Sequence, residues 1–158
     1  GLMSILAIYD GGDLQCPRRV LTHLEDIQCA LQERGLSLTI ADAEPQSAAV
    51  SRIHDAHGMP AYQQVEEQLT EANLFCCGAV VRTVQAGRLR LCLGTGAWAM
   101  VIALRAGDRI SLPAGLEQAI LPAAGTDCRW QDSAAEDSAL TYHPLEAPTL
   151  SGLLPLDI

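Results

Sequence analysis

The sequence predicts a mainly β domain, with a single β-barrel in its second half and one or two helices near its start. Between residues 74 and 130, short apolar segments alternate with glycine-containing turns, which is typical of consecutive antiparallel strands. The helix signals, by contrast, all fall before residue 60. A chain of 158 residues has the length of one domain and can bury a sizeable core.

The first forty residues alternate strand and helix signals. Residues 5–9 and 36–40 read as short apolar strands. Between them, Thr22 and Glu25 have the spacing of a capping box, which predicts a helix up to Arg34 that ends at Gly35. A second helix is expected from a cap at Ser47 to about residue 57.

Three parts are expected within the single domain. Residues 3–73 form an α/β lead-in, residues 74–130 the barrel core, and residues 131–158 a C-terminal tail. Residues 147–158 carry two prolines, so we expect an extended segment packed along the barrel or on a partner subunit. The barrel strands are predicted at 74–84, 88–93, 97–104, 109–112, 117–121 and 126–130.

Composition narrows the function classes. A formal net charge of −9 disfavours nucleic acid and anionic membranes as partners. No apolar run approaches the ~20 residues of a membrane-spanning helix, and no secretion signal is recognisable, so a cytoplasmic protein is expected. The six cysteines show no Cys-x-x-Cys spacing and read as reduced core residues.

Residues 105–118 contain a recognisable motif. A turn at Gly107, a short strand, a Pro113-Ala-Gly115 turn and another strand follow one another, and this order resembles the second motif of the cupin barrels. That family places a metal-binding His three residues after the Gly of Pro-x-Gly. In this chain Gln118 holds that position. The resemblance therefore implies a cupin-type barrel, of the double-stranded β-helix or jelly-roll kind, without this ligand.

The first cupin motif can be placed by counting back from Gly94. The resemblance then puts the other three family ligands at Val81, Thr83 and Gly87. Val, Thr, Gly and Gln offer no strong donor for Fe(II), Ni(II) or Zn(II). We therefore expect no metal and no other cofactor.

A sharper resemblance runs patchily over residues 3–130. The order of residues 3–9, a capped helix, Gly35, an apolar strand and Ala41-Asp42 resembles the start of acireductone dioxygenases, and residues 105–115 resemble that family's second motif. Those enzymes bind a substrate enediolate directly to Fe or Ni. Without the ligands, this chain is not expected to be a competent Fe/Ni dioxygenase.

The barrel interior is the expected binding site. If the strands keep the parity of the cupin motif, four side chains point inward, Gln118 faces them and Gln85 lies at the edge. A buried Gln needs a partner, so we predict a hydrogen bond between Thr83 and Gln118. The alternative is that these residues only fill a cavity. The four inward residues are Val81, Thr83, Leu89 and Leu91.

Candidate catalytic residues are few. Glu117 and Gln118 lie beside the vacated ligand position, and His143 could fold back over the barrel mouth. His54 and His57 share a predicted helix face, but no third metal ligand accompanies them. The same alternation predicts a basic stripe on the outside of the barrel, formed by Arg82, Arg88 and Arg90. This stripe is either a solvated or inter-subunit surface or, alternatively, an anion site.

Two functions follow and stay open. The first is a metal-free cupin that binds a small molecule or a partner in the vacated site, with assembly as a homodimer left open. The second is a metal-independent acid–base enzyme, of the isomerase, dehydratase or lyase type. A structural subunit that partners an active homologue is a third possibility, without positive support in the sequence.

Overall fold

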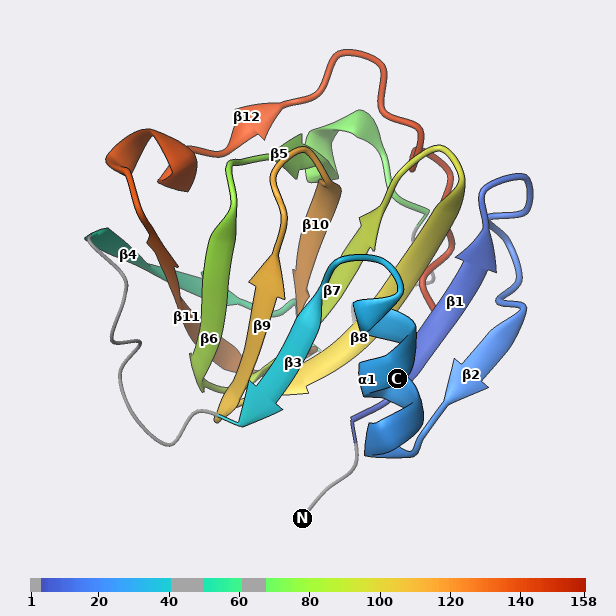
Figure 1. Ribbon diagram of the computed structural model, residues 1–158, viewed down its shortest axis with the longest axis horizontal. Coiled ribbons are helices and arrows are strands. Elements are labelled where there is room, and N and C mark those ends of the chain that lie inside the picture. The colour runs from blue at the N-terminus through green and yellow to red at the C-terminus, as the bar shows by residue number, and fades with distance from the viewer. Residues whose placement is uncertain (1–3, 41–49, 61–67) are drawn as a thin grey trace.

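The computed structural model describes residues 4–40, 50–60 and 68–158. They form two antiparallel sheets, in which strands β6, β9 and β3 lie side by side in front of β10, β7 and β8 (Figure 1). The mainly β architecture predicted from the sequence is confirmed. The seven-stranded sheet has the order β12-β5-β10-β7-β8-β1-β2, and the five-stranded sheet the order β3-β9-β6-β11-β4.

The elements have the following bounds. The seven-stranded sheet contains β1 Leu6–Asp10, β2 Arg19–Leu21, β5 Phe75–Cys76, β7 Arg88–Gly94, β8 Trp98–Arg105, β10 Glu117–Pro122 and β12 His143–Pro144. The five-stranded sheet contains β3 Ser37–Ile40, β4 Val50–His57, β6 Val80–Ala86, β9 Asp108–Leu112 and β11 Asp127–Ala134. The helices are α1 Leu24–Gln32 and two short 3₁₀ turns, η2 Glu71–Asn73 and η3 Asp137–Leu140.

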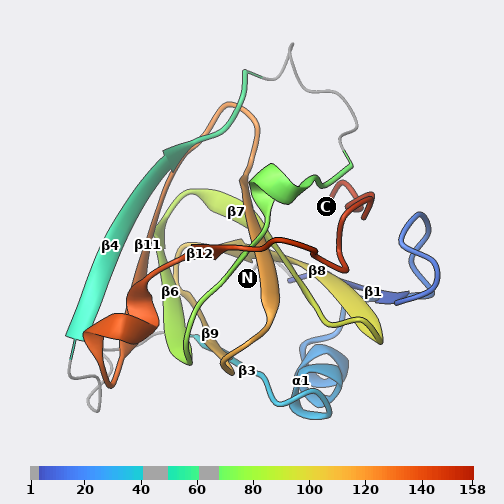
Figure 2. The same cartoon turned by 90° about the horizontal axis from the view of Figure 1, so that it is seen from above.

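The main core lies between the two sheets. Seen from above, β7 and β8 lie across from β6 and β9 (Figure 2). Leu91 and Ile102 from one sheet and Ile110 from the other are fully buried in the same hydrophobic cluster. Each buried aliphatic side chain of this size stabilises the fold by about 1.5–3 kcal/mol. The facing sheets therefore close a barrel around a packed interior.

A second hydrophobic cluster covers the outer face of the seven-stranded sheet. There Leu150 and Leu153, from residues 147–158, pack against Val101 and Ala119. The Tyr9 hydroxyl donates to the Leu154 carbonyl at 2.9 Å and accepts from the Leu156 amide at 2.9 Å. The sequence predicts that this segment packs either along the barrel or on a partner subunit, and in the structure it packs along the barrel.

Helix α1 forms where the sequence predicts it, but without the predicted capping box. Its N-cap is His23, and no side chain caps the helix. Ile27 and Leu31 are fully buried, whereas Leu24 is 47% exposed. Gly35 follows the helix with a φ of 81°, as the C-terminal signal predicted.

The helices in the described part of the chain are all too short or too polar to span a membrane.

The second predicted helix is wrong over the part that the structure describes. Strand β4 occupies residues 50–57 and pairs along its whole length with β11, while 47–49 lie outside the described residues. Pairing with β11 satisfies the backbone groups of β4 without a helix. The side chains of β4 consequently alternate between the two faces of the sheet.

Glycines occupy two tight turns, one after β6 and one before β9. Gly87 joins β6 to β7 with a φ of 75°, and Gly107 joins β8 to β9 with a φ of 100°. Residues with a Cβ disfavour this region of φ. A Cβ on Gly87 would also lie only 2.2 Å from the carbonyl oxygen of Asp127. The turn between β6 and β7 therefore requires glycine.

Candidate functional site

The inward positions of β6 differ by one residue from the sequence prediction. Val80, Arg82 and Val84 are 3%, 0% and 1% exposed, whereas Val81 and Thr83 lie on the other side of the strand and are only partly buried. A shift of one residue moves every side chain of a strand to the opposite face. Arg82, expected in an outward stripe, is thus inside the barrel, while Arg88 is exposed as predicted.

In the seven-stranded sheet, the side chains that were predicted to point into the barrel do so. Leu89 and Leu91 of β7 belong to the main core, and Gln118 of β10 is completely buried. The barrel interior therefore combines an apolar wall with two polar side chains, Arg82 and Gln118, that come from different sheets.

Arg82 forms a bidentate ion pair with Asp132. Its Nε donates to Oδ1 at 2.7 Å and its Nη2 to Oδ2 at 3.1 Å, and both side chains are fully buried. The two residues are direct partners in the β6–β11 register. Burial works against the charge on Arg82, but attraction and hydrogen bonding from Asp132 outweigh it and raise its pKa. The guanidinium is therefore permanently charged.

Gln118 links this ion pair to the other sheet. Its Oε1 accepts a hydrogen bond from Arg82 Nη1 at 2.8 Å, and its Nε2 lies 3.4 Å from the Cys77 sulfur. The predicted pair between Thr83 and Gln118 is wrong, because Thr83 Oγ1 instead accepts from Arg109 Nε at 3.1 Å. The expectation that a buried Gln118 has a partner is confirmed.

Tyr142 closes the network from the segment after η3. Its hydroxyl donates to Asp132 Oδ2 and accepts from Arg82 Nη2 at 3.2 Å and from Trp130 Nε1 at 3.0 Å. Burial raises the pKa of Tyr142 well above its ordinary value, although the Arg82 charge acts in the opposite direction. The phenol therefore stays protonated and donates to the carboxylate.

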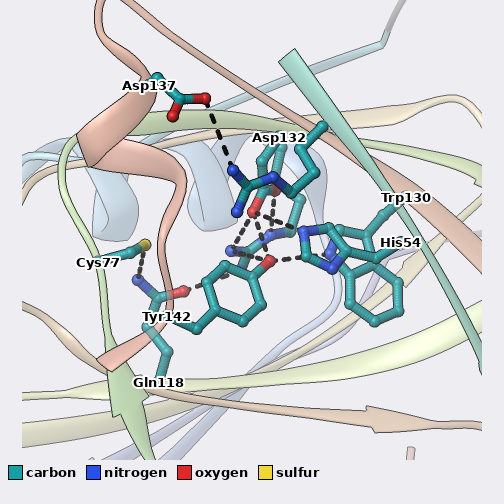
Figure 3. A network of polar contacts seen from close by, with 9 residues as sticks. His54, Cys77, Gln118, Trp130, Asp132, Asp137 and Tyr142 are labelled. Atoms are coloured by element: carbon teal, nitrogen blue, oxygen red, sulfur yellow. Dashed lines mark hydrogen bonds and ion pairs between the residues drawn. The ribbon is translucent and has the colours of Figure 1, made fainter. Parts of the chain in front are cut away.

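His54 lies in a stack of aromatic rings beside these groups (Figure 3). Its imidazole is nearly parallel to Trp130 and Tyr142, at 5.3 and 4.8 Å between ring centroids, and Tyr142 stacks in turn on Phe75 at 4.1 Å. The His54 side chain is 23% exposed. Its partly exposed ring marks the boundary between the barrel interior and the solvent.

The Nε2 atom of His54 is buried and has no hydrogen-bond partner among the described residues. It lies 4.0 Å from Asp132 Oδ2, too far for a direct hydrogen bond. Burial lowers the pKa of His54, as do the Arg82 and Arg52 charges, while Asp132 acts in the opposite direction. The imidazole is therefore neutral near pH 7.

We call the set of side chains described above the interior network. Its members are His54, Cys77, Arg82, Gln118, Trp130, Asp132 and Tyr142.

The other predicted site residues lie outside this network. Gln85 is exposed and donates to Gln131. Glu117 accepts hydrogen bonds from the Thr149 and Leu150 amides at 2.6 and 3.3 Å, so it anchors residues 147–158 rather than facing the interior. His143 is exposed in β12. His57 does not share a helix face with His54; it is exposed and pairs with Asp127.

Sequence reasoning missed Asp132, Tyr142, Trp130 and the inward position of His54. One signal could have found Asp132: the alternation of Cys128 and Trp130 continues to it, so the last strand extends to Ala134 rather than ending at residue 130. A carboxylate on the inner face of a strand requires a buried cation. Arg82 is directly opposite in the register.

The interior network does not fit the metal site of the fold family. Among residues 4–40, 50–60 and 68–158, no group of three or more His, Cys, Asp or Glu side chains is placed to hold a metal ion. The inward carboxylate, Asp132, already binds the Arg82 guanidinium with both oxygens. A divalent cation at this place would face a fixed positive charge and would have no free carboxylate.

Comparison with known proteins supports the fold. No family model and no curated protein sequence matches the chain. Among solved structures, it is similar to acireductone dioxygenase from Bacillus anthracis with cadmium ion in active center, with a TM-score of 0.62 and 11% sequence identity. The similarity covers 90% of this chain and 98% of that one. The chain therefore has a cupin fold like that of acireductone dioxygenase, as its motifs implied.

Proposed function

We propose that this chain is a metal-independent cupin that binds a small molecule and does not carry out metal-dependent dioxygenation. The observation that carries the proposal is the Arg82 guanidinium inside the barrel, held by Asp132 and Gln118. Arginine stays protonated at any physiological pH, so the interior already contains its cation. Fold similarity by itself does not assign an activity.

The binding site in this proposal is the end of the barrel at His54. His54, Tyr142 and Phe75 are partly exposed there and form a stack of nearly parallel rings. The Nε2 atom of His54 is buried beside them without a hydrogen-bond partner among the described residues, so a ligand that reaches it would satisfy it. Apolar walls with a few polar atoms are what small-molecule sites require. A planar, uncharged ligand with one hydrogen-bonding group suits this chemistry best.

Native mass spectrometry of the purified chain tests the proposal. We expect far less than one Fe, Ni, Mn or Zn per chain after growth in metal-supplemented medium, together with a copurifying or added small molecule. One tightly bound metal ion per chain in the barrel would contradict it. For planar heterocycles found by a thermal-shift screen, Tyr142→Phe and His54→Ala should weaken binding, and His57→Ala serves as the exposed control.

A second candidate is the metal-independent acid–base enzyme. The observation in its favour is a neutral imidazole, His54, placed 4.0 Å from Asp132 in a cluster that also contains Tyr142. Shifted pKa values gathered at one site are typical of catalytic groups. Turnover that falls sharply in His54→Gln, with a residual activity whose pH–rate profile lacks the acidic limb, would favour this function over binding alone.

A further inference from the structure

A separate cavity lies on the outer side of β7 and β8. Its volume is about 370 Å³, and the ends of both strands, Ala123 and Ala124, and the last two residues line it. Leu89 and Leu104 contribute to its floor, although their side chains belong to the core. This volume lies within the range of small-molecule sites, about 300–1,000 Å³.

Three arginines line this cavity. Arg88 and Arg105 are direct partners in the antiparallel β7–β8 register, and Arg90 follows two residues after Arg88 on the same side of β7. Like charges placed directly opposite each other on a sheet repel. Asp157 is the one acidic residue in the lining. Positively charged side chains therefore outnumber negatively charged ones in this lining, in a chain whose formal net charge is −9.

The guanidinium groups of the cavity differ in their contacts. Arg90 Nη1 donates to the Leu156 carbonyl at 3.1 Å, which fixes this side chain beside the end of the chain. Within the part of the chain that the structure describes, Arg88 has no hydrogen bond or ion pair through its side chain. An exposed arginine opposite another arginine offers its N–H groups to an external anion.

We propose that this basic cavity is a binding site for a small organic anion, one that carries a carboxylate or phosphate group. Arg88 would hold the oxyanion, since a planar guanidinium matches either group with two parallel hydrogen bonds, and the charge of Arg105, its partner in the strand register, adds to the attraction. The small side chains of Ala103, Ala123 and Ala124 leave room for a short organic body. The site is independent of the interior network, because none of its residues belongs to that network.

Calorimetric titration at low ionic strength tests the site, with succinate and inorganic phosphate as probes and uncharged succinamide as the matched neutral compound. The full-length chain should bind at least one of the two anions saturably, with one site per chain, and should not bind succinamide. Binding of succinate alone would identify a carboxylate site, and binding of phosphate alone a phosphate site. No saturable binding of either anion would overturn the proposal.

Arg88→Gln is the decisive variant, because it removes no hydrogen bond or ion pair within the described structure. The Kd for the anion should rise at least about tenfold, as expected when one charged hydrogen-bonding group is lost. Arg19→Gln makes the same charge change at an exposed position of β2 and should leave the Kd unchanged. An equal rise of the Kd in both variants would show that the anion is attracted by the general charge of the surface, and would refute a built site. Tyr142→Phe should keep anion binding, which separates this test from that of the proposed function.

Discussion

Arg82 and Arg88 lie on consecutive strands of different sheets, joined by one glycine turn, yet their surroundings are opposite. Arg82 is fully buried, and its Nε, Nη1 and Nη2 each donate a hydrogen bond to Asp132, Gln118 or Tyr142. Arg88 is exposed and, among the described residues, has no side-chain partner. Burial of a charge demands a complete set of partners, whereas an exposed charge can remain available to a ligand. The contrast therefore separates an arginine that stabilises the barrel from one that can bind an anion.

The largest expected effect comes from removing the buried cation. Arg82→Leu leaves the Asp132 carboxylate buried without its ion pair and should lower the free energy of unfolding by about 3–5 kcal/mol. Arg88→Leu, on the surface, should change it by no more than about 0.5 kcal/mol. Urea denaturation of both variants measures the difference.

The double variant Arg82→Leu with Asp132→Leu sharpens this test. Replacing both partners by apolar residues removes the uncompensated charge, so most of the lost stability should return. If the double variant were as unstable as Arg82→Leu alone, the cost would come from packing rather than from the unpaired carboxylate.

A smaller effect is expected for Gln118→Leu. The side chains are similar in size, but one N–H of Arg82 loses its acceptor inside the barrel. An unsatisfied buried donor costs about 1–3 kcal/mol, and the same denaturation experiment measures it. Gln85→Leu, at an exposed position, is the control. Equal stabilities of the two variants would place the Gln118 amide outside the network.

Glu117→Ala tests the attachment of the outer segment and should cost about 1 kcal/mol. The Glu117 carboxylate accepts from the Thr149 and Leu150 amides. Without it, hydrogen exchange of these two amides should accelerate, while exchange in β7 and β10 remains slow. Unchanged protection of Thr149 and Leu150 would show that these contacts do not hold the segment.

The smallest effect concerns pH. Burial lowers the pKa of His54 in the folded chain, so the unfolded chain binds more protons once the pH falls below the unfolded value of about 6.5. The stability associated with neutral His54 is therefore present above that pH and is lost as the pH falls toward the lower, folded pKa. His54→Phe should keep the stack and show a shallower loss between pH 7 and pH 5.

The exposed His57 provides the matched control for this experiment. His57→Phe should retain the part of the pH dependence that comes from His54, because the His54 imidazole is unchanged. If the two variants showed the same slope of unfolding free energy against pH, the burial of His54 would have no role in the acid sensitivity of the fold.

The sequence was informative where apolar alternation and turn residues act together. The strands from β7 to β10 follow their predicted ranges closely, because the inner faces are apolar and glycines mark the turns at 87 and 107. The single strand predicted at 74–84 is wrong, because the structure has two strands there, β5 at 75–76 and β6 at 80–86. Strand β4 was missed because its outer positions include Ile53, which is 56% exposed, so hydrophobicity does not follow the period of two. Its strand conformation depends on pairing with β11, a contact distant in sequence.

The interior network was harder to predict than the strands. Arg82 lies between Val81 and Thr83 on β6 and therefore reads as the polar, outward position of an alternating strand, and this reading reversed Arg82 and its neighbours. Only the pairing of β6 with β11 places Asp132 opposite and makes the buried charge stable. Tyr142 and His54 reach the site from segments that flank the barrel, a convergence that local patterns do not encode.

The turn at Gly87 has an evolutionary consequence. The family resemblance places a metal-binding carboxylate there, but the first side-chain carbon would collide with the backbone of β11. Substitutions at this position would therefore have to be preceded by a displacement of β11, and each step before that displacement would destabilise the protein. Gly87 is therefore a position at which selection for a stable fold acts against every side chain, whatever its chemistry.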